Sequence, residues 1–277
     1  MKSNYKINLT AAATLIALGS FASVHAGTVT WDNNGGAGDN EWGTATNWDG
    51  DAVPGNDDTV IINNGDTVNI TGNALSSNGA NLDISVSGSA LTFTGVGGFW
   101  QFNMAGATIS LDGTSSFNGG GQYVRLFGSG FVIEDRARIS NIATLEINGA
   151  GGSFTFGLEG SDPFNTIGLN NLGFSGGVTD AIDNTAFVVD FDGYTGGAQT
   201  FDLIDWSDVS ATGLTEAIFA TANFSFLNGT GYEGSTFNWN DTTNTVSLTV
   251  AVPEPSSAAA LLGLVAVFAM VQRRKRS

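Results

Sequence analysis

The chain has 277 residues, 26 of them acidic and only nine lysine or arginine, and its formal net charge is −17 at pH 7. Nucleic acid and anionic membrane surfaces are poor partners for such a protein, because both carry the same sign of charge. The absence of cysteine means that the fold rests on core burial rather than on disulfides. With 42% hydrophobic and 10% aromatic residues, the chain is expected to fold.

The first 26 residues have the pattern of a secretory signal peptide. Lys2 and Lys6 precede an apolar run over residues 9–22, and the run ends shortly before Val24-His25-Ala26. Small residues before the cut are what a signal peptidase reads, so cleavage is expected between Ala26 and Gly27. A buried N-terminal helix is the alternative, but it would need a polar face, which this run lacks.

Cleavage would remove most options for catalysis. The only histidine, His25, would leave with the signal peptide, which excludes a Ser-His-Asp triad and a histidine-ligated zinc site. Residues 27–252 contain no lysine, and they hold three arginines and 25 acids, so 3 minus 25 leaves a net charge of −22. Carboxylate chemistry remains, and we expect a protein that is not an enzyme and has no organic cofactor.

Residues 28–62 place Trp31, Trp42 and Trp48 among glycine, asparagine and aspartate. Three large rings in a polar segment need apolar surface, so they are predicted to cover the end of a hydrophobic core. The segment resembles the Trp-rich opening of autotransporter-like β-helix surface proteins, and this resemblance implies a first coil just after it. A tryptophan platform that stacks on sugar rings is the alternative.

The loops over residues 32–41 and 49–58 concentrate aspartate and asparagine oxygens, the ligands that calcium prefers. Neither loop has the spacing of an EF-hand. Asp57 and Asp58 are the predicted ligands if a structural calcium ion is bound. Otherwise they are solvated turn residues.

From Thr59 onward, apolar and polar residues alternate with a period of two, which predicts short half-buried strands. Clusters of glycine, asparagine and serine separate these strands and indicate turns. A short helix is predicted over residues 214–220. The alternating apolar pairs and triplets are Leu82, Ile84 and Val86; Leu91 and Phe93; Ile109 and Leu111; Leu145 and Ile147; Phe154 and Phe156.

An all-β chain of many short strands must close into a barrel, pair two sheets, or coil. Irregular strand spacing favours an irregular right-handed parallel β-helix, a solenoid, through about residue 160. The longer strands from Phe187 onward predict a terminal β layer. A β-sandwich or jelly roll is the alternative. No linker is visible, so residues 27–251 are predicted to form one exported domain.

Asp190 and Asp192 alternate with apolar residues, so both carboxylates project from one strand face, about 7 Å apart. This separation falls in the range of about 6.5–9.5 Å that is typical of inverting glycosidases. Any outward strand face can carry such a pair, and a solvated face is the favoured interpretation.

Glu134, Asp135, Arg136 and Arg138 form a cluster of mixed charge, with Arg125 shortly before it. Basic groups of this kind could bind an acidic polysaccharide in a lyase. The favoured interpretation is that the arginines neutralise acids on neighbouring coils, because a net charge of −22 repels an anionic polymer.

The tail over residues 252–277 has the features of a targeting segment rather than of part of the fold. Pro253 and Pro255 flank Glu254 and keep the backbone extended. The apolar run over residues 258–271 is short for a membrane span, which takes about 20 residues. A basic cluster then stops export and stays on the cytoplasmic side: Arg273, Arg274, Lys275 and Arg276. A plain single-pass anchor is the alternative.

These features together resemble the PEP-CTERM sorting signal: a Pro-Glu-Pro motif, here Val252, Pro253, Glu254 and Pro255, then a hydrophobic helix and an arginine-rich end. The resemblance implies processing by an exosortase, with the tail membrane-anchored only until then, much as a GPI signal is removed. It also implies a Gram-negative bacterium that makes exopolysaccharide or biofilm, and a protein on its outer surface or in its matrix.

The sequence therefore predicts a structural or adhesive surface protein whose partners are signal peptidase, exosortase and extracellular polysaccharide. One alternative is a carbohydrate-active β-helix enzyme, a glycoside hydrolase or polysaccharide lyase. Another is an ice-binding protein or other adhesin, although Thr92 and Thr94 form only a local threonine pair.

Overall fold

The computed structural model describes residues 27–36, 38–71, 82–94, 101–134, 136–160, 166–206, 213–240 and 242–251. Strands dominate these residues, so the predicted all-β class is confirmed. The predicted signal helix and the predicted C-terminal hydrophobic helix lie outside the described residues. No helix within the described ranges is long and apolar enough to cross a membrane.

The strands form two large sheets. The first has eight strands, in spatial order β1 (Thr28–Thr30), β2 (Thr59–Ile62), β4 (Asp83–Ser87), β7 (Thr108–Asp112), β9 (Ser129–Ile133), β11 (Gly152–Gly157), β13 (Ala186–Asp190) and β15 (Asn223–Leu227). The second has nine: β16 (Thr236–Asn240), β17 (Thr245–Val250), β14 (Gln199–Trp206), β12 (Ile167–Ser175), β10 (Arg138–Asn148), β8 (Ser116–Phe127), β5 (Ala90–Thr94), β3 (Thr67–Thr71) and, beside β8, β6 (Gln101–Ala105).

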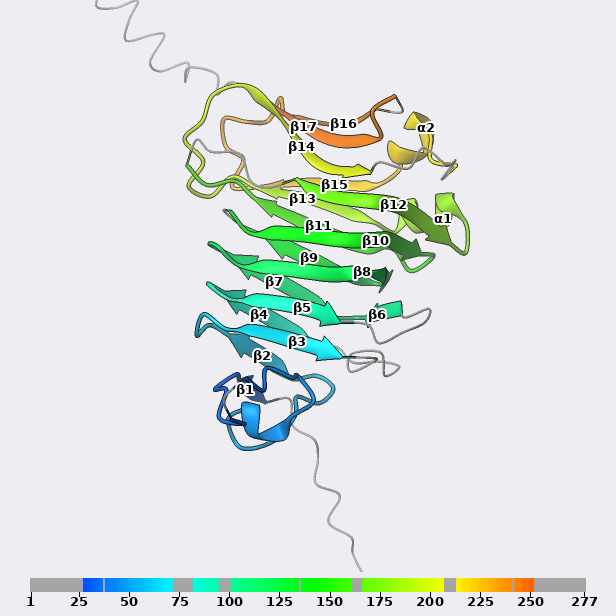
Figure 1. The fold of residues 1–277 in the computed structure, drawn as a ribbon. Coiled ribbons are helices and arrows are strands. Elements are labelled where there is room, and N and C mark those ends of the chain that lie inside the picture. The colour runs from blue at the N-terminus through cyan, green and yellow to red at the C-terminus, as the bar shows by residue number, and fades with distance from the viewer. Residues whose placement is uncertain are drawn as a thin grey trace, which may run out of the picture.

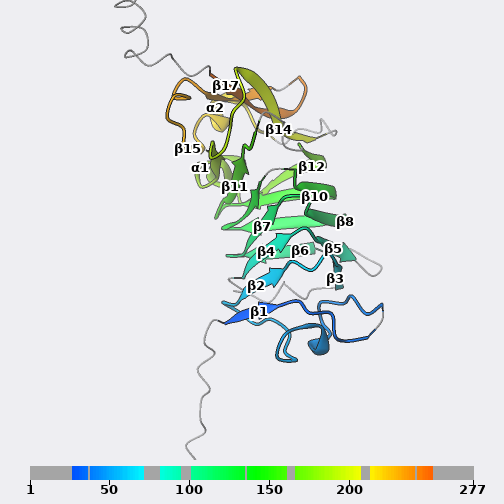
Figure 2. The same cartoon turned by 90° about the vertical axis from the view of Figure 1, so that its left-hand side faces the viewer.

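From β2 to β15 the chain alternates between the two sheets, except that β5 and β6 both belong to the second. Every pairing within the first sheet is parallel, and so is every pairing from β3 to β14 in the second. Figure 1 shows the strands stacked in chain order from blue to yellow, and Figure 2 shows the same stack from its side. Parallel pairing does not fit the antiparallel jelly roll or sandwich. We interpret the body as a solenoid, and its right-handed β-helical coil stays a prediction.

The core lies between the sheets, and parallel register stacks like side chains on each other. Phe131, Phe154, Phe187 and Phe224 are in register on four successive strands of the first sheet. Their neighbouring ring centroids are 6.5, 5.5 and 5.8 Å apart, as expected for aromatic packing. The alternating apolar pairs and triplets predicted from the sequence are all buried.

The predicted terminal β layer exists, but it begins later than predicted. β13 and β15 continue the parallel ladder, and antiparallel pairing begins only where β14 meets β17, which also pairs with β16. The prediction relied on strand length, and length does not show whether a strand pairs in parallel or antiparallel. The predicted helix is confirmed as α2 (Glu216–Phe219), whereas α1 (Val178–Asp183) was missed because six residues show no clear helical period.

The three tryptophans close the other end of the core, beside the short helix η1 (Ala45–Asn47). Trp31, Trp42 and Trp48 are at most 1% exposed. The ring of Trp48 meets those of Trp31 and Trp42 edge-on, at 4.9 and 4.7 Å. Core capping is therefore confirmed, and the sugar-stacking platform is wrong because the rings are not accessible. The likeness to autotransporter-like openings stays a prediction.

Candidate functional site

An acidic groove of about 270 Å³ lies along one end of the first sheet. Its lining residues come from the ends of β9, β11 and β13 and from the turns that follow these strands. Four of them are carboxylates. The lining residues are Glu134, Gly157, Leu158, Glu159, Asp190, Asp192 and Gly193.

Parallel register places these carboxylates together. Ile133 pairs with Leu111 and with Phe156, and Gly157 pairs with Asp190. Glu134 follows Ile133, so one outward row runs from Asp112 through Glu134 and Gly157 to Asp190. The glycine leaves space in this row, because a Cβ at position 157 would lie 3.0 Å from Glu134 Cγ. The groove is open at this point for that reason.

Hydrogen bonds orient one of the carboxylates. Asp190 Oδ1 accepts from Asn228 Nδ2 at 2.8 Å and from the backbone N–H of Asp192 at 3.0 Å. Both donors are neutral, and none of the lining residues is a cation. The lining of the groove therefore gathers four carboxylates and no cation.

Burial raises the pKa of Glu134, and the nearby carboxylates of Asp112, Asp190 and Glu159 raise it further. A carboxyl group with a raised pKa beside further carboxyl groups is an arrangement that can transfer a proton. It does not form a metal cage: within the described residues no three acidic, histidine or cysteine side chains converge as ligands.

The raised pKa of Glu134 predicts a pH-dependent effect of Glu134→Gln. The native state binds this proton more tightly than the unfolded state, so stability falls as pH rises from the ordinary carboxyl pKa through the raised one. We expect the variant to melt at a higher temperature than the wild type at pH 7, with the difference disappearing at pH 4. Thermal unfolding across this range measures the effect.

Glu233→Gln is the matched control, because the N–H of Gly231 bonds the Glu233 carboxylate at 3.0 Å and lowers its pKa. It should show no gain at pH 7. A Glu134→Gln gain that persisted unchanged at pH 4 would contradict the electrostatic cause.

The sequence predicted only part of the groove. Asp190 and Asp192 both line the groove, but they do not share a strand face as predicted, because β13 ends at Asp190 and Asp192 lies in the turn beyond it. Glu134, which was predicted in the mixed-charge cluster, lies against them instead, and Glu159 was missed. Neither could be found from local spacing, because register joins them across tens of residues. Asp135 lies outside the described residues.

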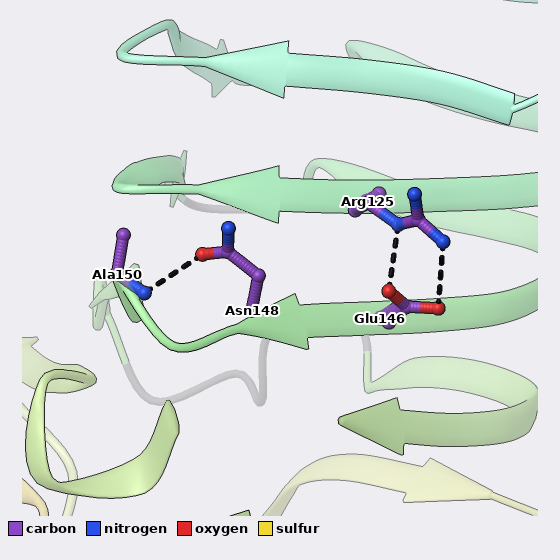
Figure 3. Close-up of polar contacts among 4 residues, drawn as sticks. All are labelled: Arg125, Glu146, Asn148 and Ala150. Carbon is purple, nitrogen blue, oxygen red and sulfur yellow. Dashed lines mark hydrogen bonds and ion pairs between the residues drawn. The ribbon is translucent and has the colours of Figure 1, made fainter. Parts of the chain in front are cut away.

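The predicted neutralisation of acids by arginines is confirmed for Arg125. It is in register with Glu146 on the neighbouring strand β10. Its Nε lies 2.6 Å from Oε1 of Glu146, and its Nη2 donates to Oε2 at 3.1 Å (Figure 3). The same view shows Asn148 Oδ1 accepting from the Ala150 N–H, which holds the turn after β10.

Arg125 belongs to the second sheet, whereas the carboxylates of the groove belong to the first. Arg138, at the exposed start of β10, lines a separate depression with Ser140 and Thr166. The lyase alternative would require these two arginines beside the acidic groove, and the structure does not place them there.

The predicted calcium ligands lie in the loop before β2. Asp58 accepts backbone N–H groups with both oxygens, from Gly27 at 2.9 Å and from Gly55 at 2.7 Å. Asp57 is exposed and has a positive φ of 66°. Calcium at these two residues stays a prediction.

Ala26, the four residues of the predicted sorting motif and the basic cluster all lie outside the described residues. Comparisons with known proteins address this part of the chain. A family model of the PEP-CTERM protein-sorting motif matches residues 251–276. No curated protein and no solved structure matches the chain.

The match covers the Pro-Glu-Pro motif, the hydrophobic run and all four residues of the basic cluster. Such a motif is the signal of an exported protein that an exosortase sorts. The chain therefore carries a PEP-CTERM sorting motif at residues 251–276, the signal of an exported protein directed to the cell surface.

Proposed function

We propose that the β body is a structural or adhesive component of the outer surface or extracellular matrix of a Gram-negative bacterium, in contact with exopolysaccharide, and that it is not an enzyme. One observation carries the proposal: the sorting motif follows the folded body without a spacer. Val250, the last residue of β17, is 1% exposed, and the family match begins at residue 251. Processing of the motif would thus take place immediately next to the folded β body.

The body has features of a scaffold. Its core runs continuously from Trp31 to Val250, and its parallel strands cover one another's edges. Residues 27–252 hold neither histidine nor lysine, so few catalytic groups are available. The ice-binding alternative gains little from register: Thr94 pairs with Thr71, but Thr92 lies between Asn69 and Asn118, so the threonines do not continue as a row through Thr92.

Sorting is tested by replacing Pro253, Glu254 and Pro255 together with alanine. We expect the wild type outside the cell to lack residues 273–276, and the variant to keep them and remain in the inner membrane. Intact mass and protease shaving of whole cells measure both results. Ser256→Ala with Ser257→Ala is the matched control. A variant that is processed and displayed like the wild type would refute the role of the motif.

The acidic groove favours a second candidate, a carbohydrate-active enzyme. In this candidate Glu134, with its raised pKa, would be the proton donor, and Asp190 the base. Under our proposal the purified protein releases neither reducing ends nor unsaturated products from neutral and acidic polysaccharides. Release that Glu134→Gln or Asp190→Asn abolishes would establish the enzyme instead.

A further inference from the structure

Gly27, the residue that follows the predicted cleavage site, is held at the edge of the first sheet. Its C=O accepts from the Thr59 N–H at 2.8 Å, just before the parallel register in which Thr28 pairs with Thr59. Its N–H donates to Asp58 Oδ1 at 2.9 Å. The other oxygen of Asp58 accepts from the Gly55 N–H at 2.7 Å, which fixes the carboxylate in this orientation.

We propose that Asp58 is the binding site for the α-ammonium group that signal cleavage creates at Gly27. Hydrolysis adds water across the Ala26–Gly27 peptide bond: the hydroxyl goes to the carbonyl carbon of Ala26 and a hydrogen to the nitrogen of Gly27. The released amine then takes a proton at neutral pH. The nitrogen of Gly27, which is a neutral amide donor in the precursor, becomes a cation next to the Asp58 carboxylate. The proposal rests on the export step of the proposed function.

The surrounding charges favour this ion pair. Two further carboxylates lie near this edge: Asp57 precedes Asp58, and Asp83 is in register with Thr59 on β4. In the precursor the donor of this hydrogen bond is a neutral amide, whereas the mature terminus places a positive charge beside the carboxylate and so adds a Coulombic attraction. The mature N-terminus would thus be tied more firmly to β2 than the same residue in the precursor.

The geometry also fixes the order of events. The nitrogen bound by Asp58 is the nitrogen of the scissile peptide bond. A peptidase must surround this bond in an extended segment, so it cannot cut while Gly27 is docked between Asp58 and Thr59. Cleavage therefore precedes the docking of β1, and Asp58 captures the new terminus afterwards.

The test measures the pKa of the N-terminal amine in protein recovered from the outside of producing cells and kept in EDTA, so that no calcium ion competes with the amine for Asp58. Reductive methylation with ¹³C-formaldehyde labels amines while leaving a charged nitrogen with one N–H. Because residues 27–252 contain no lysine, the label marks the α-amine and, where the tail is retained, Lys275. An ordinary α-amine has a pKa of about 7.7–8.0. We expect a clearly higher value in the folded protein, and the ordinary value in urea.

Asp58→Asn should return the amine of the folded protein to the ordinary range. Asp57→Asn is the matched control, since it removes one neighbouring charge without removing the partner, and it should leave the value raised. If Asp58→Asn does not fold, the difference between folded and urea-unfolded wild type still decides the result. An ordinary pKa in the folded wild type would overturn the proposal, and so would a mature chain that begins at a residue other than Gly27. The display of the Pro253–Pro255 variant reports on the opposite end of the chain, so the two proposals can fail separately.

Discussion

Replacing Phe154 with alanine should lower the free energy of unfolding by about 3–5 kcal/mol. Phe154 is fully buried between Phe131 and Phe187, with ring centroids 6.5 and 5.5 Å away. Both neighbours are held in register by the parallel ladder, so they cannot move in to fill the space. Urea unfolding followed by tryptophan fluorescence measures the loss, which should appear as a lower midpoint with an unchanged slope.

Phe226→Ala is the matched control for this prediction. Phe226 is only half-buried, in the last strand of the same sheet, with Phe237 5.3 Å away. Solvent can reach the site, so no closed cavity forms and the loss should be much smaller. If Phe154→Ala cost no more than Phe226→Ala, the aromatic ladder would not be the tight core described above.

The second large effect is expected at Asn47, which is fully buried beneath the tryptophan cap. Its Nδ2 donates to the carbonyls of Asp39 and Glu41, at 2.9 and 3.1 Å, and its Oδ1 accepts from the Gly35 N–H at 2.9 Å. Asn47→Ala leaves three backbone groups without these partners, each at a cost of about 1–3 kcal/mol where water cannot replace them. We expect a loss of at least about 3 kcal/mol and a red shift of tryptophan emission.

Asn34→Ala tests whether this effect depends on burial. Asn34 is exposed, and its Nδ2 donates to Asp32 Oδ2 at 2.7 Å in the same segment. Because water can replace this bond, stability should change by no more than about 0.5 kcal/mol. Equal losses for the two variants would show that the cap does not depend on the buried amide.

Predictions from the sequence were most accurate where local chemistry decides the structure. Alternation of apolar and polar residues identified strands such as Leu82–Val86 and Phe154–Phe156, because side chains of a strand project alternately to its two faces. The helical spacing of Leu214, Ala217 and Ile218, just after Gly213, identified α2. The polar setting of Trp42 and Trp48 indicated that these rings cover a core end, since nothing else nearby could shield them.

Apart from the missed helix α1, the errors and omissions share one cause. Whether a strand pairs in parallel or antiparallel depends on where the chain returns, so the composition of β13 and β15 could not show that they continue the first sheet. The acidic groove needs the register of β9, β11 and β13, and the Arg125–Glu146 pair needs that of β8 and β10. Residues far apart in the chain become neighbours only through this register.

The sequence by itself determined the all-β class, the buried faces of the strands and the sorting motif, because alternation, turn chemistry and a linear signal are all local along the chain. Only the tertiary structure decided that Glu134 and Glu159 join Asp190, and that Asp58 meets Gly27. The sequence of a strand does not specify which strand it pairs with. Hydrogen bonds between neighbouring strands set the register, and this register brings distant carboxylates to one edge of a sheet.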